Sequence, residues 1–236
     1  WQNSENLWLH QIKYYPTDLT ANKNIAEYYR LENDLENHFK YLSIAVQAWP
    51  DEVSVAFGMS LFYTENPGYE DYEQALYWAD RSLALNPSYP GIYINRSFIN
   101  GKLGNETEAL NDLEKAQQLD PNNPSIYLNQ AVLYKSIGRL DKAVASLDRY
   151  LSIRPNDGDR WIIQSELFVE MANYEKALEA VSQGLSINPG NGVYHYRQGL
   201  ILDQMGLIEE AKRAISNSRT YGFVDQEGIG EAILDK

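Results

Sequence analysis

The chain has 236 residues, of which 44% are hydrophobic and 22% charged, so it can bury a core and is not intrinsically disordered. Its 33 acidic residues against 20 Lys and Arg give a net charge of −13. This charge argues against nucleic acid as a partner, because affinity for nucleic acid comes mostly from neutralising phosphates, and it favours a neutral or basic partner. The chain has no Cys, which excludes a disulfide framework, a thiol nucleophile and Cys-ligated metal.

Prolines divide the chain at nearly regular intervals of 34, 37, 34, 34 and 34 residues. They are Pro16, Pro50, Pro87, Pro121, Pro155 and Pro189. The residues in front of them also repeat, for example Leu-Ala-Leu-Asn before Pro87 and Leu-Ser-Ile-Asn before Pro189. A period of this length indicates one supersecondary unit that stacks on its neighbours.

The proline register predicts the following segments in chain order. Residues 1–18 form half a repeat with a single helix, and residues 226–236 form a capping helix. Six complete repeats lie between them, at residues 19–52, 53–89, 90–123, 124–157, 158–191 and 192–225. The second repeat is three residues longer than the others. We expect the excess to form a longer loop around Pro67-Gly68, because Pro-Gly favours a turn.

Small residues recur at position 20 of the repeat, where two helices would approach most closely. They are Ala75, Ala109, Ala143, Ala177 and Ala211. His38 takes this position in the first repeat, so we expect its two helices to lie further apart. Large residues at positions 4, 7, 11 and 24 are expected to fill the space around the contact. Asn100 is the exception at position 11.

This pattern resembles the tetratricopeptide-repeat family over essentially the whole chain. The resemblance implies an all-α fold, a right-handed α-solenoid of about six helix pairs, with the first helix of each pair (helix A) lining a concave groove. In the fourth repeat, Gly138 is expected to end helix A in the left-handed conformation, and Asp141 can cap the second helix, helix B. In the third repeat, Asn105 and Glu108 have the spacing of a capping box.

The N-terminal residues carry a second resemblance. Trp1-Gln-Asn-Ser-Glu-Asn-Leu-Trp8, followed by Tyr15-Pro16, is similar to the segment that joins the last membrane span to the repeats in transmembrane-and-tetratricopeptide-repeat O-mannosyltransferases. The resemblance implies an accessory domain on the non-cytoplasmic side of a membrane; otherwise a cytoplasmic protein is expected. We also expect the single helix of residues 1–18 to belong to a larger protein or to be covered by another subunit. No stretch approaches the ~18 apolar residues of a membrane span, so the chain itself is not expected to insert.

No catalytic, metal or cofactor site is predicted, and the chain is not expected to be an enzyme. His10, His38 and His195 fall in different repeats, and His195 takes an aromatic position, where a packed structural histidine is expected. The HExxH, GxSxG, Walker and GxGxxG motifs are all absent from the sequence.

Three Asn residues occupy position 6, on the predicted groove: Asn24, Asn95 and Asn129. An Asn amide offers both a donor and an acceptor, which matches a peptide backbone unit. The repeats of nucleocytoplasmic O-linked N-acetylglucosamine transferases have a ladder of Asn at this position, and the three residues resemble a partial version of it. The alternative is that Asn is simply tolerated at a solvent-facing position.

Apolar residues dominate positions 5 and 9 of the middle repeats, and part of this strip is expected to pack against the next helix A. The predicted groove residues besides the three Asn are Ile94, Phe98, Leu128, Val132, Ile162, Tyr196 and Arg197. Exposed apolar strips commonly mark binding sites. The sequence therefore predicts a non-catalytic scaffold that binds an extended peptide or partner segment. The alternatives are the accessory domain of a membrane glycosyltransferase, and a structural spacer or oligomerisation module. The oligomeric state is not predicted.

Overall fold

The structure is a computed structural model, and it describes residues 2–226 and 228–235. Trp1 of the N-terminal motif lies outside the described residues, as do Glu227 and Lys236 of the predicted capping segment.

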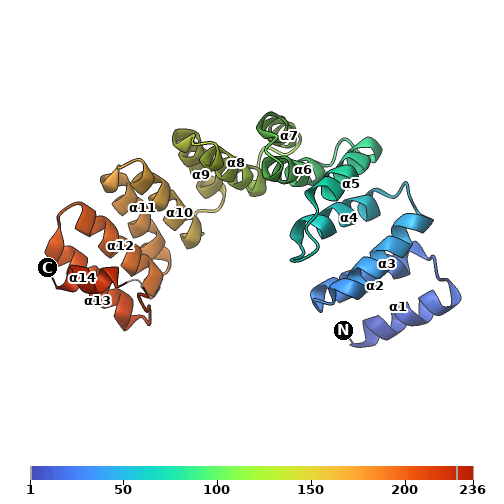
Figure 1. Ribbon diagram of the computed structural model, residues 1–236, viewed down its shortest axis with the longest axis horizontal. Coiled ribbons are helices and arrows are strands. Elements are labelled where there is room, and N and C mark those ends of the chain that lie inside the picture. The colour runs from blue at the N-terminus through green and yellow to red at the C-terminus, as the bar shows by residue number, and fades with distance from the viewer. Residues whose placement is uncertain (1, 227, 236) are drawn as a thin grey trace. The chain divides into compact units, whose positions relative to one another are not determined.

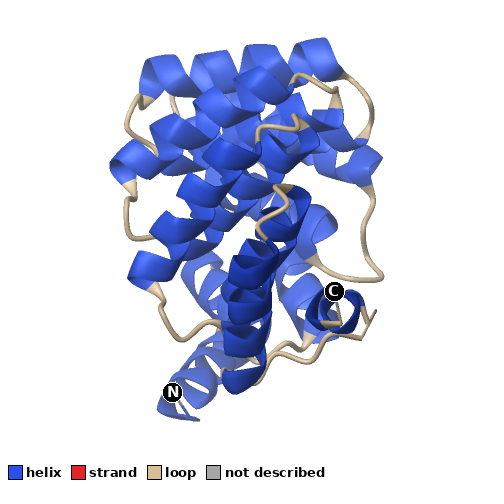
Figure 2. Ribbon diagram, turned by 90° about the vertical axis from the view of Figure 1, so that its left-hand side faces the viewer, coloured by secondary structure: helices blue, strands red, loops and turns tan. Residues whose placement is uncertain are grey.

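The described residues form fourteen helices and no strand, which confirms the all-α solenoid prediction (Figure 2). The helices are α1 (Gln2–Tyr14), α2 (Leu19–Leu31), α3 (Leu35–Ala48), α4 (Val53–Glu65), α5 (Tyr72–Leu85), α6 (Pro90–Lys102), α7 (Glu106–Leu119), α8 (Pro124–Ser136), α9 (Leu140–Ile153), α10 (Gly158–Glu170), α11 (Tyr174–Ile187), α12 (Gly192–Gln204), α13 (Ile208–Thr220) and α14 (Ile229–Leu234). The even-numbered helices α2 to α12 are the A helices, and each is followed by its helix B (Figure 1).

The chain forms two compact units, residues 1–126 and 127–236, and α8 begins in the first and continues in the second. In the first unit sequential contacts join each pair of neighbouring helices from α1·α2 to α6·α7, and α4 also contacts α6. In the second unit the same sequential contacts run from α9 to α14, and α14 also contacts α12. Each unit is thus built from contacts between near neighbours, as expected for a repeat protein.

Alanines occupy the position at which helices A and B of a repeat approach each other most closely. The five alanines at position 20 are all fully buried. In the second unit Ala143 packs with Ala131, Leu147 and Leu167. The residue that replaces alanine in the first repeat, His38, is also buried, and its ring stands edge-on to Phe62 with the ring centroids 5.1 Å apart.

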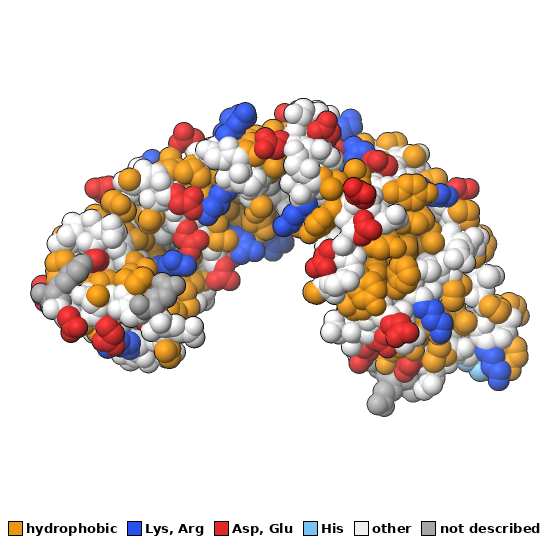
Figure 3. Space-filling view, viewed as in Figure 1, with side chains coloured by type: hydrophobic (Ala, Val, Ile, Leu, Met, Phe, Trp, Pro, Cys, Tyr) orange, Lys and Arg blue, Asp and Glu red, His pale blue; other side chains and the backbone are white. Residues whose placement is uncertain are grey.

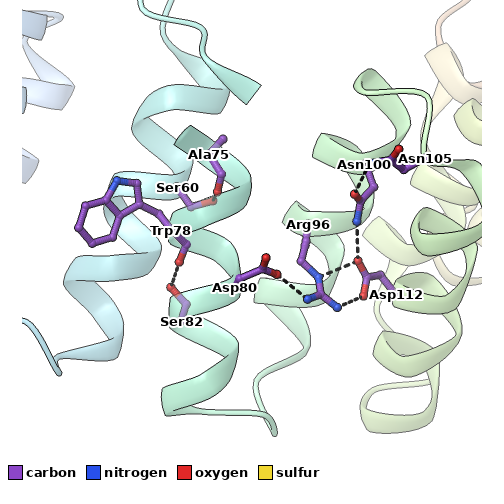
Figure 4. Close-up of polar contacts among 9 residues, drawn as sticks. All are labelled: Ser60, Ala75, Trp78, Asp80, Ser82, Arg96, Asn100, Asn105 and Asp112. Carbon is purple, nitrogen blue, oxygen red and sulfur yellow. Dashed lines mark hydrogen bonds and ion pairs between the residues drawn. The ribbon is translucent and has the colours of Figure 1, made fainter. Parts of the chain in front are cut away.

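A polar network takes the place of the aromatic residue missing at Asn100 (Figure 4). The Asn100 amide donates to Asp112 Oδ2 over 3.2 Å, and Arg96 donates to both oxygens of Asp112 over 3.0 and 2.6 Å. Arg96 also donates to Asp80 on α5 over 2.7 Å, and the hydrogen bonds to Asp112 raise the pKa of the guanidinium. The network ties α6 to the helices on both sides of it.

Two predicted helix caps are wrong and one left-handed glycine is confirmed. Asn105 stands at the N-cap of α7 but makes no side-chain cap, and its amide group donates to Asn100 Oδ1 over 3.2 Å. Asp141 lies inside the first turn of α9, whose N-cap is Arg139. Gly138 has φ of 71°, in the left-handed region that glycine adopts without strain.

The loop between α4 and α5 covers residues 66–71 and contains the Pro67-Gly68 turn. Gly68 has φ of 83°, and its N–H donates to Glu70 Oε2 over 2.6 Å. Tyr69 then packs its ring against Phe62 at 5.2 Å. The loop therefore adds an aromatic side chain to the core of the first unit.

We expect Ala143→Trp to lower the free energy of unfolding by at least about 1–3 kcal/mol, because the indole overpacks a site with no free space. Thermal melting measures the loss. Ala145→Trp on the exposed side of the same helix is the control and should melt close to the unchanged chain. Equal melting midpoints for the two variants would show that the repeat register is wrong.

Candidate functional site

The second unit has a cleft of about 530 Å³ between the A helices α10 and α12. It is lined by Ser165, Glu166, Val169, Glu170, Arg197, Leu200, Ile201, Asp203, Gln204 and Ile229. Arg197 pairs with Glu166 over 3.0 Å and so bridges the two A helices, while Glu170 pairs with Lys135 of α8 over 2.6 Å. The cleft combines an aliphatic surface with a charged rim.

The first unit has a cleft of about 670 Å³ between the A helices α2 and α4. Lys23 donates to Ser54 Oγ over 2.5 Å and so bridges the two helices. Arg30 donates to both carboxylate oxygens of Glu27 over 2.7 Å, and the hydrogen bond lowers the pKa of Glu27. Glu65 contributes a further carboxylate to the lining. This cleft is more polar than the one between α10 and α12.

His38 lines the cleft between α2 and α4 from beneath. The side chain is buried, and its Nδ1 has no hydrogen-bond partner. Burial lowers the pKa of the imidazole, and the nearby Arg30 lowers it further, whereas Glu27 raises it. The imidazole is therefore held in its neutral form to a lower pH than in an unfolded chain.

Hydrophobic side chains reach the molecular surface among charged side chains of both signs (Figure 3). Of the predicted groove residues, Asn24 and Arg197 line the two clefts. Val132 on α8 is 57% exposed. The remaining half-buried members are Ile94, Phe98, Leu128 and Asn129.

Three predicted groove residues are core residues instead. Asn95 is only 8% exposed, and its amide donates to Ser60 Oγ over 2.7 Å, so it joins α6 to α4. That Ser60 hydroxyl donates in turn to the Ala75 carbonyl over 2.8 Å (Figure 4). Ile162 is buried over Gly184, where an added Cβ would lie 3.1 Å from Ile162 Cδ1. Tyr196 is also buried in the core of the second unit.

The C-terminal segment explains the burial of Tyr196. Its hydroxyl donates to Asp225 Oδ1 over 3.1 Å, and its ring packs on Phe223 with the centroids 4.5 Å apart. The direction of the side chain is thus set by residues that follow α13, at the end of the predicted sixth repeat.

The predicted groove residues do not include those that line the α10–α12 cleft at positions 12 and 13, although tetratricopeptide-repeat arrays line their concave face at these positions too. The lining residues are Val169, Glu170, Asp203 and Gln204. Their role in lining the cleft could have been predicted, because positions 12 and 13 lie on the same face of helix A as position 9. The place of Ile229 in this cleft could not be predicted in that way, since Ile229 belongs to α14 and not to an A helix of the repeats.

Within residues 2–226 and 228–235, no three His, Asp or Glu side chains come together in a way that could hold a metal ion. His195 stacks on Tyr221 at 5.2 Å, and its Nε2 lies 2.9 Å from the Pro189 carbonyl oxygen. In the same described part of the chain, no helix has the length and apolar character needed to cross a membrane.

We expect the chain to lose stability as the pH falls below about 6.5, because the unfolded chain then takes up a proton that folded His38 resists. The loss is about 1.4 kcal/mol for each unit by which folding lowers the pKa. Urea midpoints at pH 7.5 and 5.0 measure it, and His38→Phe should reduce the difference between them. His10→Phe at an exposed position is the control, and an equal pH dependence in all three chains would show that His38 does not contribute.

Comparison with known proteins identifies the repeat. Residues 102–167 match the family model described as Tetratricopeptide repeat. No curated protein matches the chain significantly. The comparisons give no support to the resemblance between residues 1–16 and membrane O-mannosyltransferases, which stays a prediction.

Three solved structures illustrate the similarity of fold. The APC/C hetero-tetramer Cut9-Hcn1 is similar over 100% of this chain and 46% of its own, with a TM-score of 0.71 and 15% identity, so this chain spans less than half of that one. A tetratricopeptide repeat protein from Parabacteroides merdae is similar over 98% of this chain and 90% of its own, with a TM-score of 0.69 and 17% identity. YrrB, described as a TPR protein with an unusual peptide-binding site, is similar over 83% of this chain and 98% of its own, with a TM-score of 0.62 and 15% identity.

At these identities the structural likeness shows the fold alone. The match to the family model lies within a chain that forms helix pairs of this kind in both of its units. Residues 102–167 are therefore similar to the tetratricopeptide-repeat family, and the fold of the chain is similar to that of solved tetratricopeptide-repeat proteins.

Proposed function

We propose that this chain is a non-catalytic scaffold that holds an extended segment of a partner protein on the faces of its A helices. Tetratricopeptide-repeat folds serve in general as scaffolds for protein–protein interaction. YrrB, which has this fold, is described as having a peptide-binding site. The likeness to YrrB supports a peptide ligand for this chain.

The observation that carries the proposal is that clefts in two separate units use the same repeat positions. Position 9 lines both clefts from both of their A helices, as Glu27 and Leu61 in one and Glu166 and Leu200 in the other. Positions 6 and 13 contribute to both clefts as well. A repeated surface offers equivalent sites at regular spacing, which suits an extended chain.

The side chains at these positions can contact both the backbone and the apolar side chains of a peptide. Asn24 offers a donor and an acceptor to backbone groups, and each such hydrogen bond contributes about 0.5–1.5 kcal/mol net. Leu61 and Leu200 offer apolar contact, at about 25 cal/mol for each Å² removed from water. Polar groups would position the segment, while apolar groups would add affinity.

The net charge of −13 favours a neutral or basic partner. A field of one sign raises the rate of encounter with a partner of the opposite sign and excludes partners of like charge.

The second candidate is an accessory domain of a membrane glycosyltransferase. It depends on the sequence motif at residues 1–16, whose Trp1 lies outside the described residues. The reading frame of the full-length protein tests it. Several apolar segments of about 20 residues would support this candidate, and a frame without them would exclude it.

We expect Val132→Lys to weaken binding of partner segments about tenfold, which corresponds to about 1.4 kcal/mol. Val132 is exposed at position 9 of α8, so the change removes apolar contact and adds a charge that repels a basic segment. Peptides are first selected by display against the unchanged chain and then titrated against the variant by calorimetry.

The matched control is Val224→Lys, which adds the same charge at a valine that is 75% exposed and lies outside the A helices. It should leave the affinity unchanged. A similar affinity for both variants would show that the selected segments bind elsewhere than on the A helices.

A further inference from the structure

We infer that Asn105 is an acceptor site for N-linked glycosylation, because the fold presents the segment Asn105-Glu106-Thr107 at the surface. The acceptor pattern is Asn, then any residue except Pro, then Ser or Thr. In this sequence Asn95 and Asn105 satisfy it, whereas Asn86-Pro87-Ser88 and Asn123-Pro124-Ser125 carry the excluded Pro. The inference does not rest on the proposed function, because it concerns the turn between α6 and α7 and not the clefts between A helices.

The turn between α6 and α7 leaves the whole acceptor segment accessible. Asn105, Glu106 and Thr107 are all exposed. Gly104, directly before them, has φ of 79°, and a Cβ added to it would meet no atom of the described residues within 4 Å. A sugar attached to Asn105 can therefore extend into solvent without displacing packed side chains.

The contacts of the Asn105 amide group are compatible with a sugar on its nitrogen. Asn105 stands at the N-cap of α7 but makes no side-chain hydrogen bond to that helix, so modification would not remove a cap. The amide nitrogen donates to Asn100 Oδ1 over 3.2 Å. A glycosylated amide nitrogen keeps one of its two hydrogens, so it can still donate this bond.

The other matching segment, Asn95-Arg96-Ser97, is closed to the reaction in the folded chain. Asn95 is 8% exposed, and its amide donates to Ser60 Oγ over 2.7 Å. Ser97 is 3% exposed, and its hydroxyl donates to the Ile94 carbonyl over 2.7 Å. A sugar on Asn95 would have to lie between α6 and α4, so a chain modified there could not form this contact. The fold therefore favours Asn105 alone.

The reaction takes an oligosaccharide from a lipid pyrophosphate carrier, and an oligosaccharyltransferase catalyses it. The Asn105 amide nitrogen forms a bond to the anomeric carbon of the first sugar, while the bond between that carbon and the pyrophosphate oxygen breaks. The lipid pyrophosphate leaves with the electron pair, and a base of the transferase takes the proton that the amide loses. The product carries a bulky, solubilising group on the α6–α7 turn.

The test is expression of the full chain behind a cleavable secretion signal in a eukaryotic host, with mass spectrometry of the secreted protein. Treatment with a peptide N-glycosidase converts a glycosylated Asn to Asp, which locates the site in the peptide map. We expect a glycan on Asn105 and none on Asn95. The melting midpoint of the glycosylated chain should not fall below that of the unmodified chain.

Thr107→Ala should abolish the glycan, because it removes the hydroxyl that the acceptor pattern requires at an exposed position. Thr107→Ser restores a hydroxyl and should recover the modification. The matched control is Ser97→Ala, which removes the other matching segment and should leave the glycan on Asn105 unchanged.

Three results would overturn the inference. They are a secreted chain without a glycan on Asn105, equal occupancy of Asn95 and Asn105, and a Thr107→Ala variant that keeps the glycan. If the chain is not secreted, the purified folded chain is incubated with an oligosaccharyltransferase and a lipid-linked oligosaccharide. Modification of Asn105 would then support the inference, and its absence would overturn it.

Discussion

The structure depends on the close approach of two helices at positions that hold only small side chains. The alanines at position 20 are fully buried, so helices A and B pack with their backbones near each other and the larger residues surround that contact. Because each helix contacts mainly its sequence neighbours, the same geometry is repeated along each unit. The A helices consequently present the same repeat positions, and the clefts between α2 and α4 and between α10 and α12 follow from that repetition.

Where a residue differs from the repeat pattern, nearby side chains make new contacts with it, and the polarity of that site changes. His38 stands where the other repeats have alanine, and it is buried against Phe62 and lines the α2–α4 cleft. Asn100 replaces an aromatic residue, and it joins Arg96 and Asp112 in a network between α6 and α7. Such substitutions keep the helix pairs together while they change polarity and charge. The two clefts accordingly share positions and differ in chemistry.

The period, the buried alanines and the left-handed Gly138 could be predicted because each depends on residues within one repeat. The direction of the side chains at positions 5 and 6 could not be predicted, since these positions lie between the exposed face of helix A and the core. Asn95 is buried because Ser60, 35 residues away, accepts its hydrogen bond. Ile162 is buried because Gly184 leaves room for it, and Tyr196 because Asp225 and the C-terminal segment cover it. Such partners cannot be inferred from the repeat register.

A partner held on the A helices should shield their backbone amides from solvent. Hydrogen exchange of the full chain, with and without a saturating display-selected peptide, tests it most directly, because added protection reports where the ligand lies. We expect the added protection to concentrate in A helices such as α10 (Gly158–Glu170) and α12 (Gly192–Gln204), and their B partners α11 and α13 to change less. Protection concentrated in α11 (Tyr174–Ile187) and α13 (Ile208–Thr220) would show that the partner binds the B helices instead.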